Sequence, residues 1–282
     1  MQKKIYNILI TGSGAPGAPG IIRSLQDNEE LNLFLADANP NAYGSLLNFP
    51  FYKIPAALEP DFIDEVLKIS LQDKIDLILP LVTKELNLFA LYKNKFEEHN
   101  IQIVVSEISN LKIANHKIEL YKKLQENGII VPDFLEVKRL DELEKSIDIL
   151  SKNGKIPVTI KPAESNGSRG FRIIDSKIDN WDLFFNKKPN STFINKNNLI
   201  EILSQKDFPP LLLSEYLPGM EYSVDCLAKN GETLVAVPRS RIRMVEGISV
   251  EGMVEKNEEI INYCKAIIKV LQLNGPIGIQ VK

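Results

Sequence analysis

The chain has 282 residues, of which 44% are hydrophobic and 25% are charged, so its composition is that of a globular protein and excludes wholesale disorder. Its 34 lysines and arginines against 37 aspartates and glutamates give a net charge of −3, which leaves no chain-wide basic surface for nucleic acid or an anionic membrane. No apolar run approaches the roughly 18–20 residues that cross a bilayer. The two cysteines, Cys226 and Cys264, form no disulfide framework or metal-binding spacing. We therefore expect a cytoplasmic protein without nucleic-acid or membrane partners.

The first third of the sequence alternates short apolar runs with amphipathic stretches. Strands are expected at 5–11, 31–36, 76–81 and 101–105, and helices at 20–26, 62–69 and 84–98. Strands that alternate with helices and lack hairpin turns favour a parallel sheet covered on both faces. Because crossovers between parallel strands are right-handed, the pattern predicts a doubly wound, Rossmann-like α/β domain.

The pattern changes after residue 110. A helix is expected at 118–127, ended by Gly128, and strands are expected at 157–161, 171–174, 211–215, 222–229 and 233–238. Asn230-Gly231 lies between the last two strands and is a strong signal for a hairpin turn. This half is therefore predicted to be α+β with antiparallel sheets. Residues 186–198, rich in Asn, Lys and Ser, are interpreted as a surface excursion.

A glycine-rich loop follows the first predicted strand. Residues 12–17 match G-x-G-x-x-G, and Asp37 lies 20 residues after Gly17, where a dinucleotide-binding fold places the acid that binds the ribose. Glycines let the backbone approach an anion at a helix N-terminus. However, Pro16 and Pro19 remove amide donors from this loop. The loop is therefore compatible with NAD binding or with a tight strand-to-helix turn.

A second polar loop follows the strand that ends at Lys161. Residues 163–170 (AESNGSRG) offer backbone amides, hydroxyl groups and a guanidinium group to phosphate oxygens. The loop lacks the G-K-[ST] ending of a P-loop. A plain hairpin connection and a solvated lysine are the alternatives. Together, the lysine and the loop favour a nucleotide site.

The order of these segments resembles the ATP-grasp superfamily, close to carbamoyl-phosphate-synthase-like carboxylate–amine ligases. The resemblance spans nearly the whole chain and implies a pre-ATP-grasp domain at 1–112, an ATP-grasp N-terminal subdomain at 113–185 and an incomplete C-terminal subdomain at 186–282. Each segment is weak alone, so the specificity of the match comes from their order.

The resemblance also implies a set of ATP-binding residues. Lys117, in Asn115-His116-Lys117, would contact a phosphate, and Lys161 would reach the α-phosphate and the adenine. The mobile loop over the phosphates would contribute Ser165, Gly167, Ser168, Arg169 and Gly170. The hinge would line the adenine with Glu215, Tyr216 and Leu217, and Glu221 would accept hydrogen bonds from the ribose hydroxyls.

The family places arginines where this chain has Arg239, Arg241 and Arg243, to hold the γ-phosphate and the acyl phosphate. Their alternation puts all three on one face if they lie on one strand. A solvated basic strand face is the alternative interpretation.

The resemblance also implies a role for the N-terminal domain. The loop at 12–20 and the segment 80–85 would face the acceptor substrate instead of binding NAD.

The chain departs from the family pattern in two places. His116 stands where the family usually has Asp. Gln280 occupies the position of the first magnesium ligand, and the chain stops before the strand that supplies the family's Glu and Asn ligands, so we expect a truncated species. A lone Gln is a poor site for Mg²⁺, which prefers several hard oxygen ligands including carboxylate.

The leading hypothesis is an ATP- and Mg²⁺-dependent ligase that activates a small-molecule carboxylate, or bicarbonate, as an acyl phosphate for attack by an amine. Two alternatives remain at this point: an NAD-dependent oxidoreductase using the loop at 12–17, and a non-catalytic ATP-binding protein. A homodimer is the default assembly.

Overall fold

The computed structural model describes residues 4–165, 169–186, 192–245 and 247–282, and the chain divides into two compact units. The N-terminal unit comprises Met1–Lys112 together with Leu227–Glu232 and Gln272–Ile277. The C-terminal unit comprises Ile113–Cys226, Thr233–Leu271 and Gly278–Lys282. Among the described residues, no helix combines the length and the apolar character that crossing a membrane requires.

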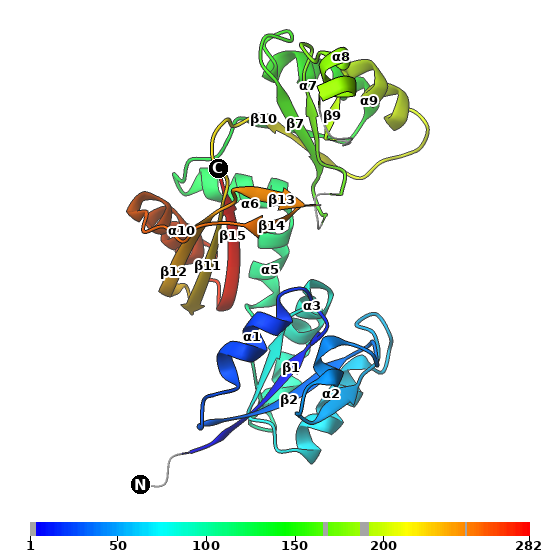
Figure 1. Ribbon diagram of the computed structural model, residues 1–282. Coiled ribbons are helices and arrows are strands. Elements are labelled where there is room, and N and C mark those ends of the chain that lie inside the picture. The colour runs from blue at the N-terminus through cyan, green and yellow to red at the C-terminus, as the bar shows by residue number, and fades with distance from the viewer. Residues whose placement is uncertain (1–3, 166–168, 187–191, 246) are drawn as a thin grey trace. The chain divides into compact units, whose positions relative to one another are not determined.

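A five-stranded parallel sheet forms the framework of the N-terminal unit, in the order β3-β2-β1-β4-β5. Figure 1 labels two of its strands, β1 and β2, in blue. Its strands are β1 (Tyr6–Thr11), β2 (Leu31–Asp37), β3 (Phe51–Lys53), β4 (Leu77–Pro80) and β5 (Gln102–Ile103). Its helices are α1 (Ala18–Leu25), the 3-10 helix η1 (Tyr43–Leu46), α2 (Phe62–Gln72), α3 (Thr83–Leu91) and α4 (Lys93–Glu97). All four strand pairings are parallel, which confirms the predicted Rossmann-like sheet.

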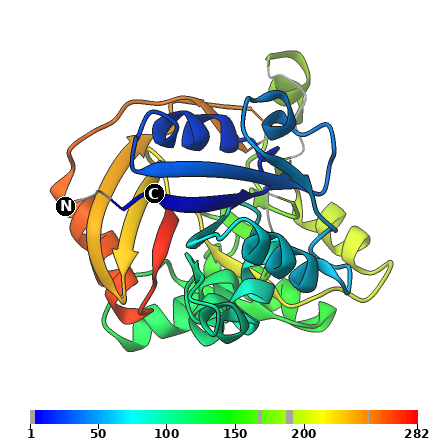
Figure 2. The same ribbon diagram turned by 90° about the horizontal axis from the view of Figure 1, so that it is seen from below.

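The alternation of side chains along β1 explains why both faces of this sheet are covered. Ile8 and Ile10 pack with Ile22 of α1 in one apolar cluster, whereas Leu9 packs with Phe89 of α3 in another. Successive side chains of a strand point to opposite faces, so a continuous apolar strand needs helices on both sides. Figure 2 shows α1, in dark blue, running along the blue strands.

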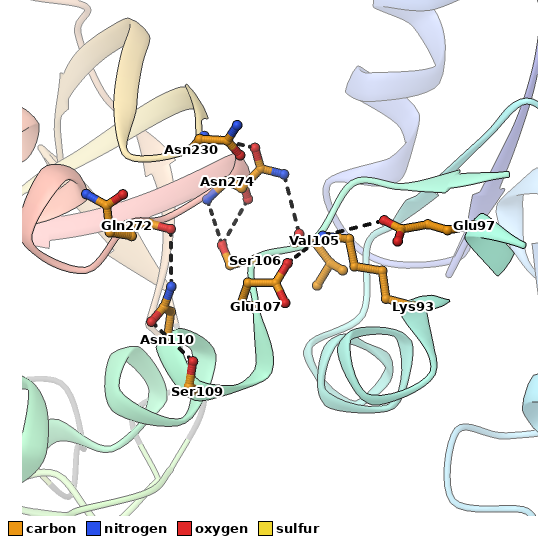
Figure 3. A network of polar contacts seen from close by, with 10 residues as sticks. All are labelled: Lys93, Glu97, Val105, Ser106, Glu107, Ser109, Asn110, Asn230, Gln272 and Asn274. Atoms are coloured by element: carbon orange, nitrogen blue, oxygen red, sulfur yellow. Dashed lines mark hydrogen bonds and ion pairs between the residues drawn. The ribbon is translucent and has the colours of Figure 1, made fainter. Parts of the chain in front are cut away.

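Two short segments from the second half of the chain belong to the N-terminal unit and are held there by polar contacts (Figure 3). Ser106 Oγ accepts a hydrogen bond from the Asn274 backbone N–H over 2.8 Å and donates one to the Asn274 carbonyl over 3.0 Å. Asn110 Nδ2 donates to the Gln272 carbonyl over 3.3 Å, and the Asn230 N–H donates to Asn274 Oδ1 over 3.2 Å. The contacts of Ser106 and Asn110 join the chain after β5 to residues more than 100 positions later.

The C-terminal unit contains a five-stranded sheet in the order β6-β10-β7-β8-β9. The strands are β6 (Phe134–Val137), β7 (Val158–Pro162), β8 (Arg172–Ile174), β9 (Phe193–Ile194) and β10 (Leu211–Glu215), and only the β8–β9 pairing is parallel. The remaining helices are α5 (Ile108–Asn115), within which the boundary between the units falls after Lys112, α6 (Lys117–Glu126), α7 (Leu140–Leu150), α8 (Asn180–Asn186), α9 (Lys196–Leu203) and α10 (Glu258–Val270). Buried residues of α7 and α9 pack against the sheet.

Two smaller sheets complete the described structure. Strands β11 (Tyr222–Lys229), β12 (Glu232–Ser240) and β15 (Gly275–Val281) are ordered β12-β11-β15, and β13 (Arg243–Val245) pairs with β14 (Ile248–Glu251). Figure 2 shows β11 and β12 as adjacent yellow arrows. Asn230 and Gly231 both have positive φ (50° and 80°) between them, as the Asn-Gly signal predicts for a hairpin turn. The second half is therefore α+β with largely antiparallel sheets, as predicted.

Some sequence expectations need correction. The helix expected at 84–98 is two helices, because Tyr92, with φ −102° and ψ 14°, departs from helical geometry between α3 and α4. The stretch at 186–198 contains β9 and the start of α9, while residues 187–191 lie outside the described residues. Helices α7 and α10, which the sequence analysis did not identify, are regular and amphipathic.

Candidate functional site

Lys117 is the first residue of α6, and three contacts fix its position. The side chain of His116 caps the helix, because its Nδ1 accepts a hydrogen bond from the Glu119 N–H over 3.2 Å. The Lys117 N–H donates to the Ala163 carbonyl over 2.9 Å. Lys117 Nζ lies 3.0 Å from the carbonyl oxygen and 3.2 Å from the Oγ of Ser165, and donates to both. His116 thus supplies the N-cap acceptor that an Asp would supply, so this departure from the family pattern preserves the local geometry.

Lys161 lies on β7, opposite Leu212 of β10. Its ammonium group stands 5.5 Å from the centre of the Tyr121 ring, which belongs to α6. The Tyr121 ring packs edge-on against Phe134 at 5.4 Å, next to the buried side chain of Ile118. The lysine therefore emerges from an apolar wall made by α6 and the sheet, and this wall limits the directions in which its ammonium group can point.

The electrostatics of these two lysines indicate a site for an anion. Burial lowers the pKa of Lys161, and the charge of Glu221 partly offsets this effect. Burial also lowers the pKa of Lys117, the positive charge of Lys161 lowers it further, and Glu164 opposes both effects. Among the described residues, neither ammonium group is within ion-pair distance of a carboxylate. Two neighbouring, partly desolvated cations fit the negative charge of a phosphate group.

The predicted loop over the phosphates is described only in part. Gly167 and Ser168 lie outside the described residues, and Ser165 is held by Lys117. Arg169 and Gly170 are exposed. Gly170 has φ +76°, and a Cβ atom there would come within 2.6 Å of the Pro162 ring, so the chain needs glycine at this point for local packing.

The predicted adenine hinge leaves the end of β10. The Glu215 N–H donates to the Asp133 carbonyl over 2.9 Å, and Glu215 Oε1 accepts from the Asp133 N–H over 3.3 Å. Tyr216 and Leu217 are partly exposed. The Lys282 ammonium group lies 4.9 Å from the centre of the Tyr216 ring. Glu215, the last residue of β10, is thus tied to Asp133 through both its backbone and its side chain, and Tyr216 and Leu217 follow outside the strand.

The three predicted catalytic arginines do not share a face. Arg239 lies on β12 and forms two hydrogen bonds with Asp225, at 2.7 and 3.2 Å. Arg243 lies on β13 and donates to Glu251 over 3.3 Å. Their side chains are 41% and 64% exposed, whereas that of Arg241, which lies between the two strands, is 4% exposed. A shared face required all three arginines to lie on one strand, and this condition is not met because β12 ends at Ser240.

Arg241 and Glu221 form an ion pair in which the arginine side chain is buried and the glutamate side chain is partly exposed. Arg241 Nη1 donates to Glu221 Oε1, and the Arg241 N–H donates to the Glu221 carbonyl over 2.8 Å. The sequence analysis gave these residues two separate roles, one at the γ-phosphate and one at the ribose. The structure brings them together.

The predicted metal ligand is isolated. Gln280 is an exposed residue of β15. Within the part of the chain that the structure describes, no group of three or more His, Cys, Asp or Glu side chains could hold a metal ion. These residues do not fit a magnesium site, which needs several oxygen ligands.

In the N-terminal unit, the Asp37 carboxylate at the end of β2 binds the backbone of the first glycine loop. The Gly14 N–H donates to Asp37 Oδ2 over 2.8 Å, and the Asn39 N–H donates to Asp37 Oδ1 over 2.8 Å. Gly12 has φ +69°, and a Cβ atom there would lie 2.3 Å from Val82 Cγ2. Both oxygens of Asp37 thus accept backbone hydrogen bonds, and these contacts stabilise the loop. This geometry favours the strand-to-helix turn over the NAD site.

Beside this loop lies a buried polar pair that the sequence analysis did not single out. Thr11 Oγ1 donates to Glu85 Oε2 over 2.6 Å, and the two residues are 0% and 6% exposed. Burial raises the pKa of the Glu85 carboxyl group to about 7, although the Thr11 hydrogen bond lowers it and the charge of Asp37 raises it. A perturbed carboxyl group at the carboxyl edge of a parallel sheet indicates a functional site. In the sequence, the signal for this site was a single acidic residue, Glu85, within the largely apolar helix α3.

Comparisons with known proteins agree with this arrangement. Residues 8–104 match the family model described as PylC-like, N-terminal domain, and residues 207–282 match the one described as ATP-grasp in the biosynthetic pathway with Ter operon. A search of curated proteins finds no match.

Solved structures share the fold. An N5-carboxyaminoimidazole ribonucleotide synthetase in complex with ADP is 17% identical, with a TM-score of 0.68, over 99% of this chain and 68% of that chain. An L-amino acid ligase from Bacillus licheniformis is 16% identical, with a TM-score of 0.62. The match covers 100% of this chain and 64% of that chain. A D-alanine–D-alanine ligase from Bacillus anthracis in complex with ATP is 16% identical, with a TM-score of 0.57, over 99% and 82% of the two chains. Residues 207–282 thus match an ATP-grasp model, in agreement with the resemblance that the order of the motifs indicates, and the chain shares the fold of these solved structures.

Proposed function

We propose that this chain binds ATP in its C-terminal unit and uses it to join a small-molecule carboxylate to an amine. The observation that carries the proposal is the pair of partly buried lysines, Lys117 and Lys161, whose pKa values are both lowered by burial. Such cations are unfavourable without a counter-charge, and a polyphosphate supplies one. The solved relatives that carry ADP or ATP support the same choice of ligand.

Each proposed contact has a structural reason. Lys117 and Lys161 bind phosphate oxygens from the wall formed by α6 and β7. The backbone of 215–217 binds the adenine edge, and the Glu221 carboxylate accepts hydrogen bonds from the ribose hydroxyls. Ser165, held by Lys117, begins the loop that covers the phosphates.

When bound, ATP supplies the phosphoryl group that activates the carboxylate as an acyl phosphate. The role of the chain is to hold the reactants in line and to neutralise the charge that develops on the transferred group. The described residues offer no cluster of magnesium ligands, so no step is assigned to a protein-bound metal. ATP enters the assays below as its magnesium complex.

The N-terminal unit is proposed to hold the acceptor, at the loop 12–20 and the segment 80–85. The buried Thr11–Glu85 pair supports this assignment. A carboxyl group with a pKa of about 7 exchanges a proton readily near neutral pH, which suits an amine substrate.

Calorimetric titration of the chain with ATP and magnesium tests the nucleotide site. We expect ATP to bind and the Lys161→Ala variant to lose at least about tenfold in affinity, since a buried charge–phosphate contact is removed. Lys145→Ala, an exposed lysine on α7, is the matched control and keeps full affinity. Unchanged affinity in Lys161→Ala contradicts the site.

Parallel experiments separate the alternatives. NAD is titrated into the same samples, and binding of NAD without ATP would restore the oxidoreductase hypothesis. ADP release is then measured with mixtures of carboxylates and amines. ATP binding with no ADP release from any mixture would favour a non-catalytic nucleotide-binding protein.

A further inference from the structure

Every nitrogen of the Arg241 guanidinium group has a partner inside the protein. Nη1 donates to Glu221 Oε1, Nη2 donates to the Gly247 carbonyl over 2.6 Å, and Nε lies 3.0 Å from Met244 Sδ. The side chain is 4% exposed, against 37% for Glu221. A guanidinium group bound in this way cannot reach a phosphate without breaking several contacts.

The backbone reinforces the pairing. Glu221 immediately precedes β11 and Arg241 immediately follows β12, and these two strands are neighbours in one sheet. The Arg241 N–H donates to the Glu221 carbonyl over 2.8 Å. The two residues are thus joined by main chain and by side chain, so a rotation of the Glu221 carboxylate would break the ion pair.

The Glu221 carboxylate also interacts with Lys161 and keeps acceptor positions that Arg241 does not use. Its charge acts on Lys161 and raises the pKa of that lysine, so the two groups are close enough to interact electrostatically. A carboxylate has about four acceptor positions, and Arg241 occupies one of them. Enough positions remain for a pair of hydroxyl donors.

We propose that Arg241 is a positioning residue for ribose recognition, which holds the Glu221 carboxylate in the orientation that accepts the ribose hydroxyls, and that it is not a phosphate ligand. This inference rests on the proposed ATP site. The other two arginines differ in kind, because Arg239 and Arg243 form exposed ion pairs that are weak and easily exchanged.

The test compares two affinity ratios in the wild type and in Arg241→Met. The first ratio is ATP against 2′-deoxy-ATP, which reports on the ribose contact. The second is ATP against ADP, which reports on the γ-phosphate. We expect the wild type to prefer ATP to 2′-deoxy-ATP at least about tenfold, since a hydrogen bond to a charged group is lost. In Arg241→Met this preference falls below about threefold, while the ATP-to-ADP ratio is unchanged.

Three further variants complete the experiment. Glu221→Gln should lose the same ribose preference, and Arg241→Lys should lose part of it, since an ammonium group cannot hold both Glu221 and Gly247 in a fork. Arg139→Met, which breaks an exposed arginine–aspartate pair at the start of α7, is the matched control and should change neither ratio. Because Glu221 is partly exposed, its carboxylate can be solvated when Arg241 is replaced. Arg241→Lys gives the readout if Arg241→Met does not fold.

The outcomes are distinct. A loss of the ATP-to-ADP ratio with the ribose preference retained would make Arg241 a γ-phosphate ligand and overturn the inference. Both ratios unchanged, with lower stability, would reduce the pair to a structural contact and also overturn it. If the wild type binds no ATP, the proposed function itself is wrong and this inference falls with it.

Discussion

Thr11 and Glu85 form a short hydrogen bond, 2.6 Å between Oγ1 and Oε2, although they are 74 residues apart in the chain. Thr11 ends β1, and Glu85 lies in the first turn of α3, which follows the neighbouring strand β4. Parallel strands bring their carboxyl ends to one edge, so the topology of the sheet creates the contact. The consequence is a buried carboxyl group whose pKa is about 7.

The raised pKa of Glu85 makes the stability of the protein depend on pH. The unfolded chain has the ordinary value of 4.5, so between pH 4.5 and 7 the folded state holds a proton that the unfolded state has lost. Stability from this group is therefore full below pH 4.5 and is lost as pH rises through 7. At about 1.4 kcal/mol per pKa unit, the wild type should lose about 3 kcal/mol relative to Glu85→Gln between pH 4.5 and pH 8.

Urea unfolding of both proteins at these two pH values measures the difference. Glu85→Gln keeps the shape of the side chain and cannot ionise, so it isolates the titration of this one group. Parallel stability curves for the two proteins would show that Glu85 ionises as easily in the folded chain as in the unfolded one.

The glycines of the first loop should respond differently to substitution. Gly12→Ala places a methyl group 2.3 Å from Val82 Cγ2 at φ +69°, and left-handed strain plus overpacking should cost roughly 2–4 kcal/mol. Gly17→Ala is the matched control, because Gly17 has φ −84° with no atom within 4 Å of the added methyl group. It should change the unfolding free energy by less than about 0.5 kcal/mol. Equal effects of the two substitutions would contradict this account.

His116 should act through its ring acceptor. His116→Ala removes the cap of α6 and should cost about 1 kcal/mol, whereas His116→Asp supplies a carboxylate acceptor at the same place and should restore most of the stability. Chemical denaturation of the three proteins at neutral pH makes the comparison. If the Asp variant were no more stable than the Ala variant, the capping role would be ruled out.

Lys161 is expected to support ATP binding while it lowers the unfolding free energy of the nucleotide-free protein. Lys161→Met replaces a partly desolvated ammonium group by an apolar side chain of similar length beside Tyr121. Without nucleotide, we expect an unfolding free energy equal to or above that of the wild type. With ATP at a hundred times its dissociation constant, the wild type should gain about 2.7 kcal/mol and the variant should not. Thermal unfolding with and without ATP measures both, and Lys145→Met serves as the control.

Much of the fold was predictable from local pattern. The apolar run of β1, the Asn230-Gly231 turn and the amphipathic α2 each carry a periodicity or a turn preference that a few neighbouring residues specify. The same kind of signal is present in α7, where Leu143 and Ile147 recur at helical spacing and are buried. The lysines Lys117 and Lys161 were identified from the order of short motifs.

The pairings of side chains were decided only by the tertiary structure. Spacing alone put Arg241 with Arg239 and Arg243, but the end of β12 at Ser240 turned it toward Glu221 and buried it. Glu85 met Thr11 only because β1 and β4 are neighbours in the sheet. Local sequence determines which segments become strands and helices, because those preferences act over a few residues. Which charged groups meet depends on contacts between residues far apart in the chain, and so does the extent to which burial shifts their pKa values. These contacts exist only once the sheet has formed.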